Sequence, residues 1–203
     1  MEPYTEMNLK RAIEDGRIPG PKMHVTSPYL EGPGAFTLQM NELDSPEEAR
    51  RMVEYWADAG IDDFKAYPHI TRAQLSAAIE EIHARGMKIT GHLCSIGFKE
   101  AAALGIDNLE HGILVNTEWV PGKEPDVCPP GGATRQSLLD LEVSSEAVQE
   151  TIRTLVDRGV AVTSKLPVYE ISFPGRPPVP QGVLDAMAAD AREAYLTRRA
   201  RVV

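Results

Sequence analysis

The sequence predicts an α/β fold built around a parallel β-sheet. Short runs rich in β-branched and aromatic residues alternate with amphipathic helical segments, and no internal repeat or low-complexity segment interrupts them. This alternation is typical of βαβ units, in which a helix connects two parallel strands. About five strand–helix units of roughly 40 residues fit the chain, whereas a closed (β/α)₈ barrel typically needs about 250 residues. The 203 residues therefore form either a small open sheet or part of a larger one.

Capping residues and glycines predict where the helices begin and end. Ser45-Pro46 with Glu48 predicts a capping box at a helix start, and Gly60 predicts its end. Thr71 and Gln74 predict a second capped helix, closed by Gly86. The expected helices cover about residues 1–16, 45–60, 71–86, 98–104, 145–158 and 183–199. The expected strands cover residues 22–26, 63–67, 87–92, 106–111 and 160–164.

Charge and composition exclude several classes of protein. A formal net charge of -9 argues against nucleic-acid binding, which needs clustered Lys and Arg. No apolar run approaches the roughly 20 residues of a membrane span. The N-terminus is typical of a helix rather than a signal peptide, and we expect the N-terminal part of the full-length protein to be missing, so the compartment is unknown. Cys94 and Cys128 are compatible with one disulfide, although we favour a half-buried free thiol for Cys94 over a soft metal ligand.

Three polar residues stand at or near the ends of predicted strands. Lys65 lies in DDFKAY, His92 ends MKITGH and His111 ends IDNLEH. The carboxyl ends of parallel strands meet at one edge of a sheet, where barrels and open α/β sheets bind ligands. Neutral imidazoles are good ligands for zinc and similar ions, whereas a protonated lysine has no lone pair to offer. Two histidines from separate strands therefore make half of a metal site.

The span IDDFKAY…HARGMKITGHL…AAALGIDNLEHG resembles the metal-dependent amidohydrolase superfamily, in its imidazolonepropionase- and prolidase-like branch. The resemblance runs from about Gly16 to Tyr169, and the opening GRIPGPK is similar to the segment before the third barrel strand. It implies a partial TIM (β/α)₈ barrel of the metallo-dependent hydrolase type, with barrel strands 3 to 7 in a single incomplete catalytic domain over residues 1–203.

The resemblance also implies the roles of individual residues. Lys65 corresponds to the lysine that is carboxylated and bridges two metals, and His92 and His111 correspond to the histidine ligands of the fifth and sixth strands. The implied cofactor is one or two divalent ions, with zinc preferred. The implied reaction is hydrolysis of a carbon–nitrogen bond in an amide, lactam or peptide-like small molecule by a metal-activated water. The His-x-His pair and the eighth-strand aspartate of the family are absent, so no catalytic residue is identified in this chain.

Further residues near the strand ends are candidates for contact with substrate. Tyr67, His69 and Tyr169 fall there, although an exposed loop histidine is the preferred interpretation of His69. Glu110 is expected to point away from His111, because neighbouring side chains alternate along a strand. The Pro- and Gly-rich segment of about 112–143 is expected to be a long loop on the catalytic face, where specificity resides.

Two alternatives to the hydrolase remain at this point. A catalytically inactive partial barrel would persist as a binding or homo-oligomerising module, since open strand edges otherwise template aggregation. An unrelated α/β enzyme is disfavoured, because the sequence has neither a Gly-rich phosphate loop nor a G-x-S-x-G motif.

Overall fold

The computed structural model describes residues 3–35, 40–167, 175 and 177–201. The chain divides into two compact units, Met1–Ser164 and Lys165–Val203. In the described residues of the first unit, six parallel strands form one open sheet in the order β2-β1-β3-β4-β5-β6. The strands are β1 (Leu30–Glu31), β2 (Asn41–Glu42), β3 (Phe64–Ala66), β4 (Ile89–Gly91), β5 (Asn108–Glu110) and β6 (Ala161–Thr163).

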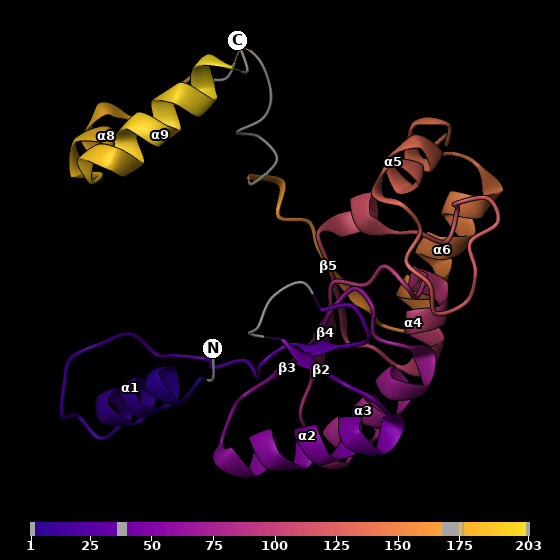
Figure 1. The fold of residues 1–203 in the computed structure, drawn as a ribbon, viewed down its shortest axis with the longest axis horizontal. Coiled ribbons are helices and arrows are strands. Elements are labelled where there is room, and N and C mark those ends of the chain that lie inside the picture. The colour runs from indigo at the N-terminus through magenta and orange to yellow at the C-terminus, as the bar shows by residue number, and fades with distance from the viewer. Residues whose placement is uncertain (1–2, 36–39, 168–174, 176, 202–203) are drawn as a thin grey trace. The chain divides into compact units, whose positions relative to one another are not determined.

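The first helix of this unit precedes β1, and the others lie between strands in the sequence. The helices are α1 (Tyr4–Glu14), α2 (Pro46–Ala59), α3 (Arg72–Ala84), α4 (Phe98–Leu104), the 3₁₀ helix η1 (Gly112–Val115), α5 (Gly131–Leu139) and α6 (Glu146–Asp157). Helices α2 and α3 lie side by side along one side of the sheet (Figure 1). The α/β class and the parallel sheet predicted from the sequence are confirmed, and the sheet is not closed.

The start of the sheet differs from the prediction. Residues 22–26 form no strand, and only Thr26 makes a bridge, to Asp63. Beyond this bridge, Leu30 of β1 pairs with Ala66 of β3. On its other side β1 pairs in parallel with β2, a strand that the sequence did not indicate. Because β1 and β2 have two residues each, they carry too little alternation to be recognised from a pattern.

The predicted helix caps account for the ends of α2 and α3. Ser45 Oγ accepts a hydrogen bond from Glu48 N, and Gly60 ends α2 with a left-handed φ of 96°. The Glu48 carboxylate, however, accepts from Asp44 N rather than from the cap residue, so the box at α2 is incomplete. Thr71 and Gln74 form the full reciprocal box at α3.

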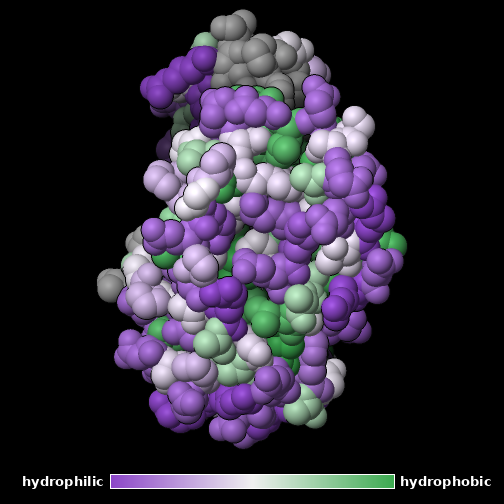
Figure 2. All heavy atoms as spheres, turned by 90° about the vertical axis from the view of Figure 1, so that its right-hand side faces the viewer, coloured by the Kyte–Doolittle hydropathy of each residue, from purple (hydrophilic) through white to green (hydrophobic). Residues whose placement is uncertain are grey.

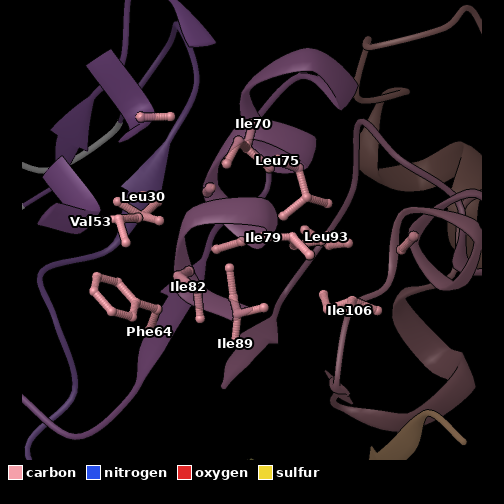
Figure 3. Close-up of a cluster of buried hydrophobic side chains, with 14 of the residues drawn as sticks. Leu30, Val53, Phe64, Ile70, Leu75, Ile79, Ile82, Ile89, Leu93 and Ile106 are labelled. Atoms are coloured by element: carbon pink, nitrogen blue, oxygen red, sulfur yellow. The ribbon is translucent and has the colours of Figure 1, made fainter. Parts of the chain in front are cut away.

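The core lies between the helices and one face of the sheet. Phe64 and Ile89, from β3 and β4, contribute fully buried side chains on this face, and α3 contributes Ile79 and Ile82 (Figure 3). Ile79 and Ile82 are among the buried apolar positions that the helical spacing of α3 predicts. The face of the molecule seen in Figure 2 is mainly hydrophilic, with apolar side chains in small patches. None of the helices within the described residues has the length and apolar character of a bilayer crossing.

The second unit contains two described helices, α8 (Gln181–Ala186) and α9 (Ala189–Ala200). The single helix predicted over 183–199 is therefore wrong, because Met187 adopts an extended backbone with ψ 143° that separates the two. Within this unit the Tyr195 hydroxyl accepts a hydrogen bond from Val179 N.

Candidate functional site

The inner face of the sheet, opposite the helices, is polar. Lys65, Thr90 and Asn108 alternate with the buried apolar side chains of β3, β4 and β5, so they project from the other face. Asn108 donates to Thr90 Oγ1 at 2.6 Å, and Thr163 donates to Asn108 at 3.1 Å. A closed barrel usually fills this space with branched apolar side chains. Here hydrogen bonds connect the strands instead.

Lys65 and Glu110 form an ion pair on this inner face. Lys65 Nζ donates to Glu110 Oε2 at 2.7 Å, and the two side chains are 12% and 11% exposed. Thr90 donates to the other carboxylate oxygen of Glu110 at 3.2 Å. The pair therefore joins β3 to β5 across β4, in the middle of the sheet.

Next to this pair, His92 and His111 lie beyond the carboxyl ends of β4 and β5. Their ring centroids are 4.3 Å apart in an edge-to-face arrangement. His111 Nε2 also lies 3.8 Å from Glu110 Oε2. The structure thus brings together two imidazoles, a carboxylate and the amine of Lys65.

The expected orientation of Glu110 is wrong. Its side chain turns to the same side as His111 rather than away from it. The physical reason is the backbone of His111, whose φ of 66° is left-handed, so that the alternation of the strand ends at Glu110. A sequence pattern contains no signal for this change of backbone direction.

An aromatic wall closes one side of the site. Tyr29 and Tyr67 stack with centroids 4.5 Å apart, and Lys65 Nζ lies 5.2 Å and 5.8 Å from their ring centres. Tyr67 also meets His92 edge-on at 5.3 Å. Burial, with Tyr29, Glu31 and Glu110 nearby, raises the pKa of the Tyr67 phenol, which therefore stays protonated at neutral pH and can donate a hydrogen bond.

The metal that the sequence implies fits these residues only in part. Neutral imidazoles at His92 and His111 supply nitrogen donors suited to zinc. The protonated Lys65 offers no lone pair, and its partner Glu110 is occupied by the ion pair. Within the described ranges, no three His, Cys, Asp or Glu side chains are placed to hold a metal ion as they stand. The two imidazoles are therefore two nitrogen donors, fewer than the three protein ligands of a typical catalytic zinc site.

The segment after His111 is anchored to the edge that carries these residues. Cys128 forms a disulfide with Cys94, two residues after His92, so the expectation of a free thiol or metal-ligand role for Cys94 is wrong. Lys123 Nζ donates to Ser95 O at 2.6 Å, and Arg72 binds the Asp126 carboxylate. The segment also contains η1 and α5, so it is not a loop throughout.

The remaining candidate residues are placed as follows. His69 lies at the same edge, three residues after β3, beside the buried Glu31. Tyr169 lies outside the described residues. Glu31, in β1, and Tyr29, just before β1, were missed in the sequence, because the first strand was expected to end at Thr26.

The chain is similar to solved structures of amidohydrolase type. No protein-family model and no curated protein sequence matches it. A proposed prolidase from Bifidobacterium longum superimposes with a TM-score of 0.56 at 18% identity, covering 97% of this chain and 44% of that one. A second structure, an amidohydrolase, superimposes with a TM-score of 0.55 at 16% identity and covers 97% of this chain and 50% of the amidohydrolase chain. Bottromycin amidohydrolase superimposes with a TM-score of 0.55 at 16% identity and covers 96% of this chain and 44% of the bottromycin amidohydrolase chain.

These similarities concern the fold. The chain spans 44% to 50% of the length of the three structures, in agreement with a sheet of six strands that does not close. The partial barrel predicted from the sequence is confirmed at this level. The chain has an amidohydrolase-type fold, of which it contains about half.

Proposed function

We propose that this chain is part of a metal-dependent hydrolase that cleaves carbon–nitrogen bonds in amide, lactam or peptide-like small molecules. The observation that carries the proposal is the 4.3 Å approach of His92 and His111 beside Lys65, at the carboxyl edge of a parallel sheet. Ligands bind at this edge in related architectures. The likeness to amidohydrolase structures supports it through the fold.

In this proposal His92 and His111 hold a divalent ion, preferably zinc, through neutral imidazole nitrogens. Lys65, if its amine were released from Glu110 and carboxylated by carbon dioxide, would supply two anionic oxygen ligands to the metal. When bound, the metal polarises the scissile carbonyl and lowers the pKa of water. Tyr67 stays protonated and donates a hydrogen bond to the substrate. The disulfide-anchored segment 112–143 covers the catalytic face and selects the substrate.

Zinc binding tests the ligand assignment. Refolded protein is equilibrated with zinc, and the bound metal is measured by elemental analysis and calorimetric titration. We expect His111→Ala and His92→Ala each to weaken binding by at least about tenfold, since loss of a direct ligand costs more than loss of a supporting contact, which typically costs 10–100-fold. His24→Ala is the matched control, because His24 is 63% exposed and lies beside Asp63 before β3. Unchanged zinc content in His111→Ala would remove the assignment.

Lysine carboxylation and turnover are tested separately. Carbon-13 NMR in labelled bicarbonate is expected to show a carbamate signal that Lys65→Met removes. Hydrolysis of an amide and dipeptide panel, abolished by a chelator and restored by zinc, would establish activity. Absence of turnover by a chain that binds zinc would mean that the donors missing from this half of the fold are needed.

A second candidate function has one observation in its favour. All three residues of the edge strand β6 are exposed, including Val162 at 44%. An uncovered parallel edge favours pairing with another chain, so an inactive binding or homo-oligomerising module is the alternative. A concentration-independent oligomer by light scattering, without zinc binding, would support it against the hydrolase.

A further inference from the structure

Glu31 is a buried carboxylate with one oxygen left unpartnered. Its side chain is fully buried at the end of β1. Oε1 accepts two backbone hydrogen bonds, from Gly32 N at 2.9 Å and from His69 N at 2.6 Å. Oε2 is buried and has no hydrogen-bond partner. Because a buried ionised oxygen without a donor is costly, a group that satisfies it is expected nearby.

That group is the imidazole of His69. Its Nδ1 lies 3.5 Å from Glu31 Oε2 and is itself buried without a hydrogen bond. A hydrogen bond between the two atoms would require them to approach to about 2.9 Å. A carboxylate can only accept, so Nδ1 must carry the proton of this contact. The contact therefore fixes the tautomer and leaves Nε2 as the free acceptor nitrogen.

The backbone holds the two residues at close quarters. A Cβ on Gly32 would lie 1.9 Å from the His69 carbonyl oxygen, so only glycine permits this approach of β1 to the segment after β3. The carbonyl of Pro68, the residue before His69, accepts from Cys94 N at 3.2 Å and from Ser95 N at 2.8 Å. His69 is thereby placed against the segment that follows His92, with its side chain 34% exposed.

We propose that Glu31 and His69 form a proton-transfer dyad at the carboxyl edge of the sheet. Glu31 is the positioning residue, and His69 Nε2 accepts and returns the proton. The place of the dyad in amide hydrolysis rests on the proposed function. Nε2 takes a proton from the attacking water as the C–O bond forms. The same proton passes to the leaving nitrogen as the C–N bond breaks, which restores the neutral imidazole.

The tautomer of His69 is the first test, and it needs neither metal nor substrate. Long-range nitrogen-15–proton NMR of the full chain is expected to show His69 protonated at Nδ1. Glu31→Gln should reverse this. The amide oxygen must occupy the Oε1 position, where two backbone donors point, so that the NH₂ group faces Nδ1. His69 should then carry its proton at Nε2.

Reactivity of Nε2 is the second test. Diethyl pyrocarbonate acylates unprotonated imidazole nitrogen, and mass spectrometry gives the rate at each histidine. We expect Glu31→Gln to slow acylation of His69 by about five- to tenfold, the equivalent of one ordinary hydrogen bond. His83, whose Nε2 contacts Asp107 Oδ2 at 3.0 Å, is the internal control and should not change. Glu80→Gln, at an exposed ion pair, is the matched control variant.

An Nε2–H tautomer of His69 in the unmodified chain would overturn the proposal, even if Glu31→Gln failed to fold. So would equal acylation rates in the two proteins. Failure of the unmodified chain to bind zinc through His92 and His111 would instead contradict the proposed function. It would leave the tautomer of His69 unaffected, so the two failures are distinguishable.

Discussion

Lys65 and Glu110 meet as an ion pair 2.7 Å long on the inner face of the sheet, although neither residue is near the other in sequence. Each side chain is only 11–12% exposed. Both charges lose most of their hydration on burial, so the pair adds little net stability to the fold. Removing only one partner is nevertheless costly, because the other charge stays buried. The lysine amine lies beside the rings of Tyr29 and Tyr67, and Glu110 Oε2 lies 3.8 Å from the imidazole of His111.

Removing one partner of this pair is expected to be costly. Lys65→Met leaves Glu110 buried without its counter-charge, which should lower the free energy of unfolding by about 3–5 kcal/mol. Adding Glu110→Gln to Lys65→Met should recover part of the loss, because a neutral amide tolerates burial better than a carboxylate. Urea unfolding of the two single variants and the double variant measures the coupling. If the loss of stability in the double variant equalled the sum of the losses in the two single variants, the ion pair would have no coupling energy.

Arg50→Met is the matched control for this experiment. Arg50 pairs with Glu80 at 2.5 Å, but the side chains are 42% and 60% exposed. Water screens this pair, so its loss should change the free energy of unfolding far less than the loss of Lys65.

The disulfide between Cys94 and Cys128 gives a second prediction. It closes a loop with a sequence separation of 34 residues. The loss of chain entropy in the unfolded state corresponds to about 3–4 kcal/mol for a loop of this size. Cys94→Ser with Cys128→Ser should therefore unfold at lower urea concentration than the oxidised chain. Dithiothreitol should lower the stability of the unmodified chain and leave that of the double variant unchanged, and a shift in both would contradict the assignment.

The sequence identified the parts of the fold that depend on repeated local signals. The capping residues Ser45 and Thr71 mark the starts of α2 and α3, and the spacing of Leu75, Ile79 and Ile82 marks the buried side of α3. The parallel sheet followed from the alternation of strands and helices, whereas the similarity to amidohydrolase barrels followed from the resemblance of the segments around Lys65, His92 and His111. Two-residue strands carry no such repetition, and β1 and β2 were misplaced or missed for that reason.

The sequence indicated the candidate site only through polar residues within or directly after predicted strands. Lys65 lies within β3, and His92 and His111 follow β4 and β5. Glu110 was expected to point away from His111, because side chains alternate along a strand. This expectation is wrong because His111 has a left-handed backbone, which ends the alternation. The contact of Glu31 with His69 joins residues 38 positions apart and depends on a glycine at position 32 that allows two segments to touch. Such contacts need the tertiary structure.

Acid is expected to weaken the attachment of α1 to the sheet. Lys10 Nζ bonds Asp62 Oδ1 at 2.5 Å, and Val25 N donates to Asp62 Oδ2 at 2.7 Å. Burial raises the pKa of Asp62, but the hydrogen bonds from Lys10 and Val25 lower it by more, so it lies below its ordinary value. A carboxyl whose pKa is depressed by folding stabilises the fold above its unfolded pKa of about 3.9. That contribution is lost as pH falls through the folded pKa.

The variant Asp62→Asn tests whether the ionised Asp62 carboxylate stabilises the fold. At pH 7 the variant should be less stable than the unmodified chain by about 1–2 kcal/mol, from the loss of charge-assisted hydrogen bonds. The difference should stay constant above about pH 5 and shrink as the pH falls below about 4. Urea unfolding at a series of pH values measures it. A difference that grows toward acid would show that Asp62 is not stabilised as the anion.

Phe64 marks the packed side of the same strand that carries Lys65. Its side chain is 0% exposed and contacts the core that α3 covers (Figure 3). Phe64→Ala should lower the free energy of unfolding by about 3–5 kcal/mol, because the transfer energy of the ring is lost and a cavity remains. Val156→Ala is the control, since Val156 is 72% exposed and its truncation should stay within about 0.5 kcal/mol. Similar losses in the two variants would mean that β3 does not face the core. In that case the inner face, with Lys65 and Glu110, would also be wrongly assigned, because the side chains of a strand alternate.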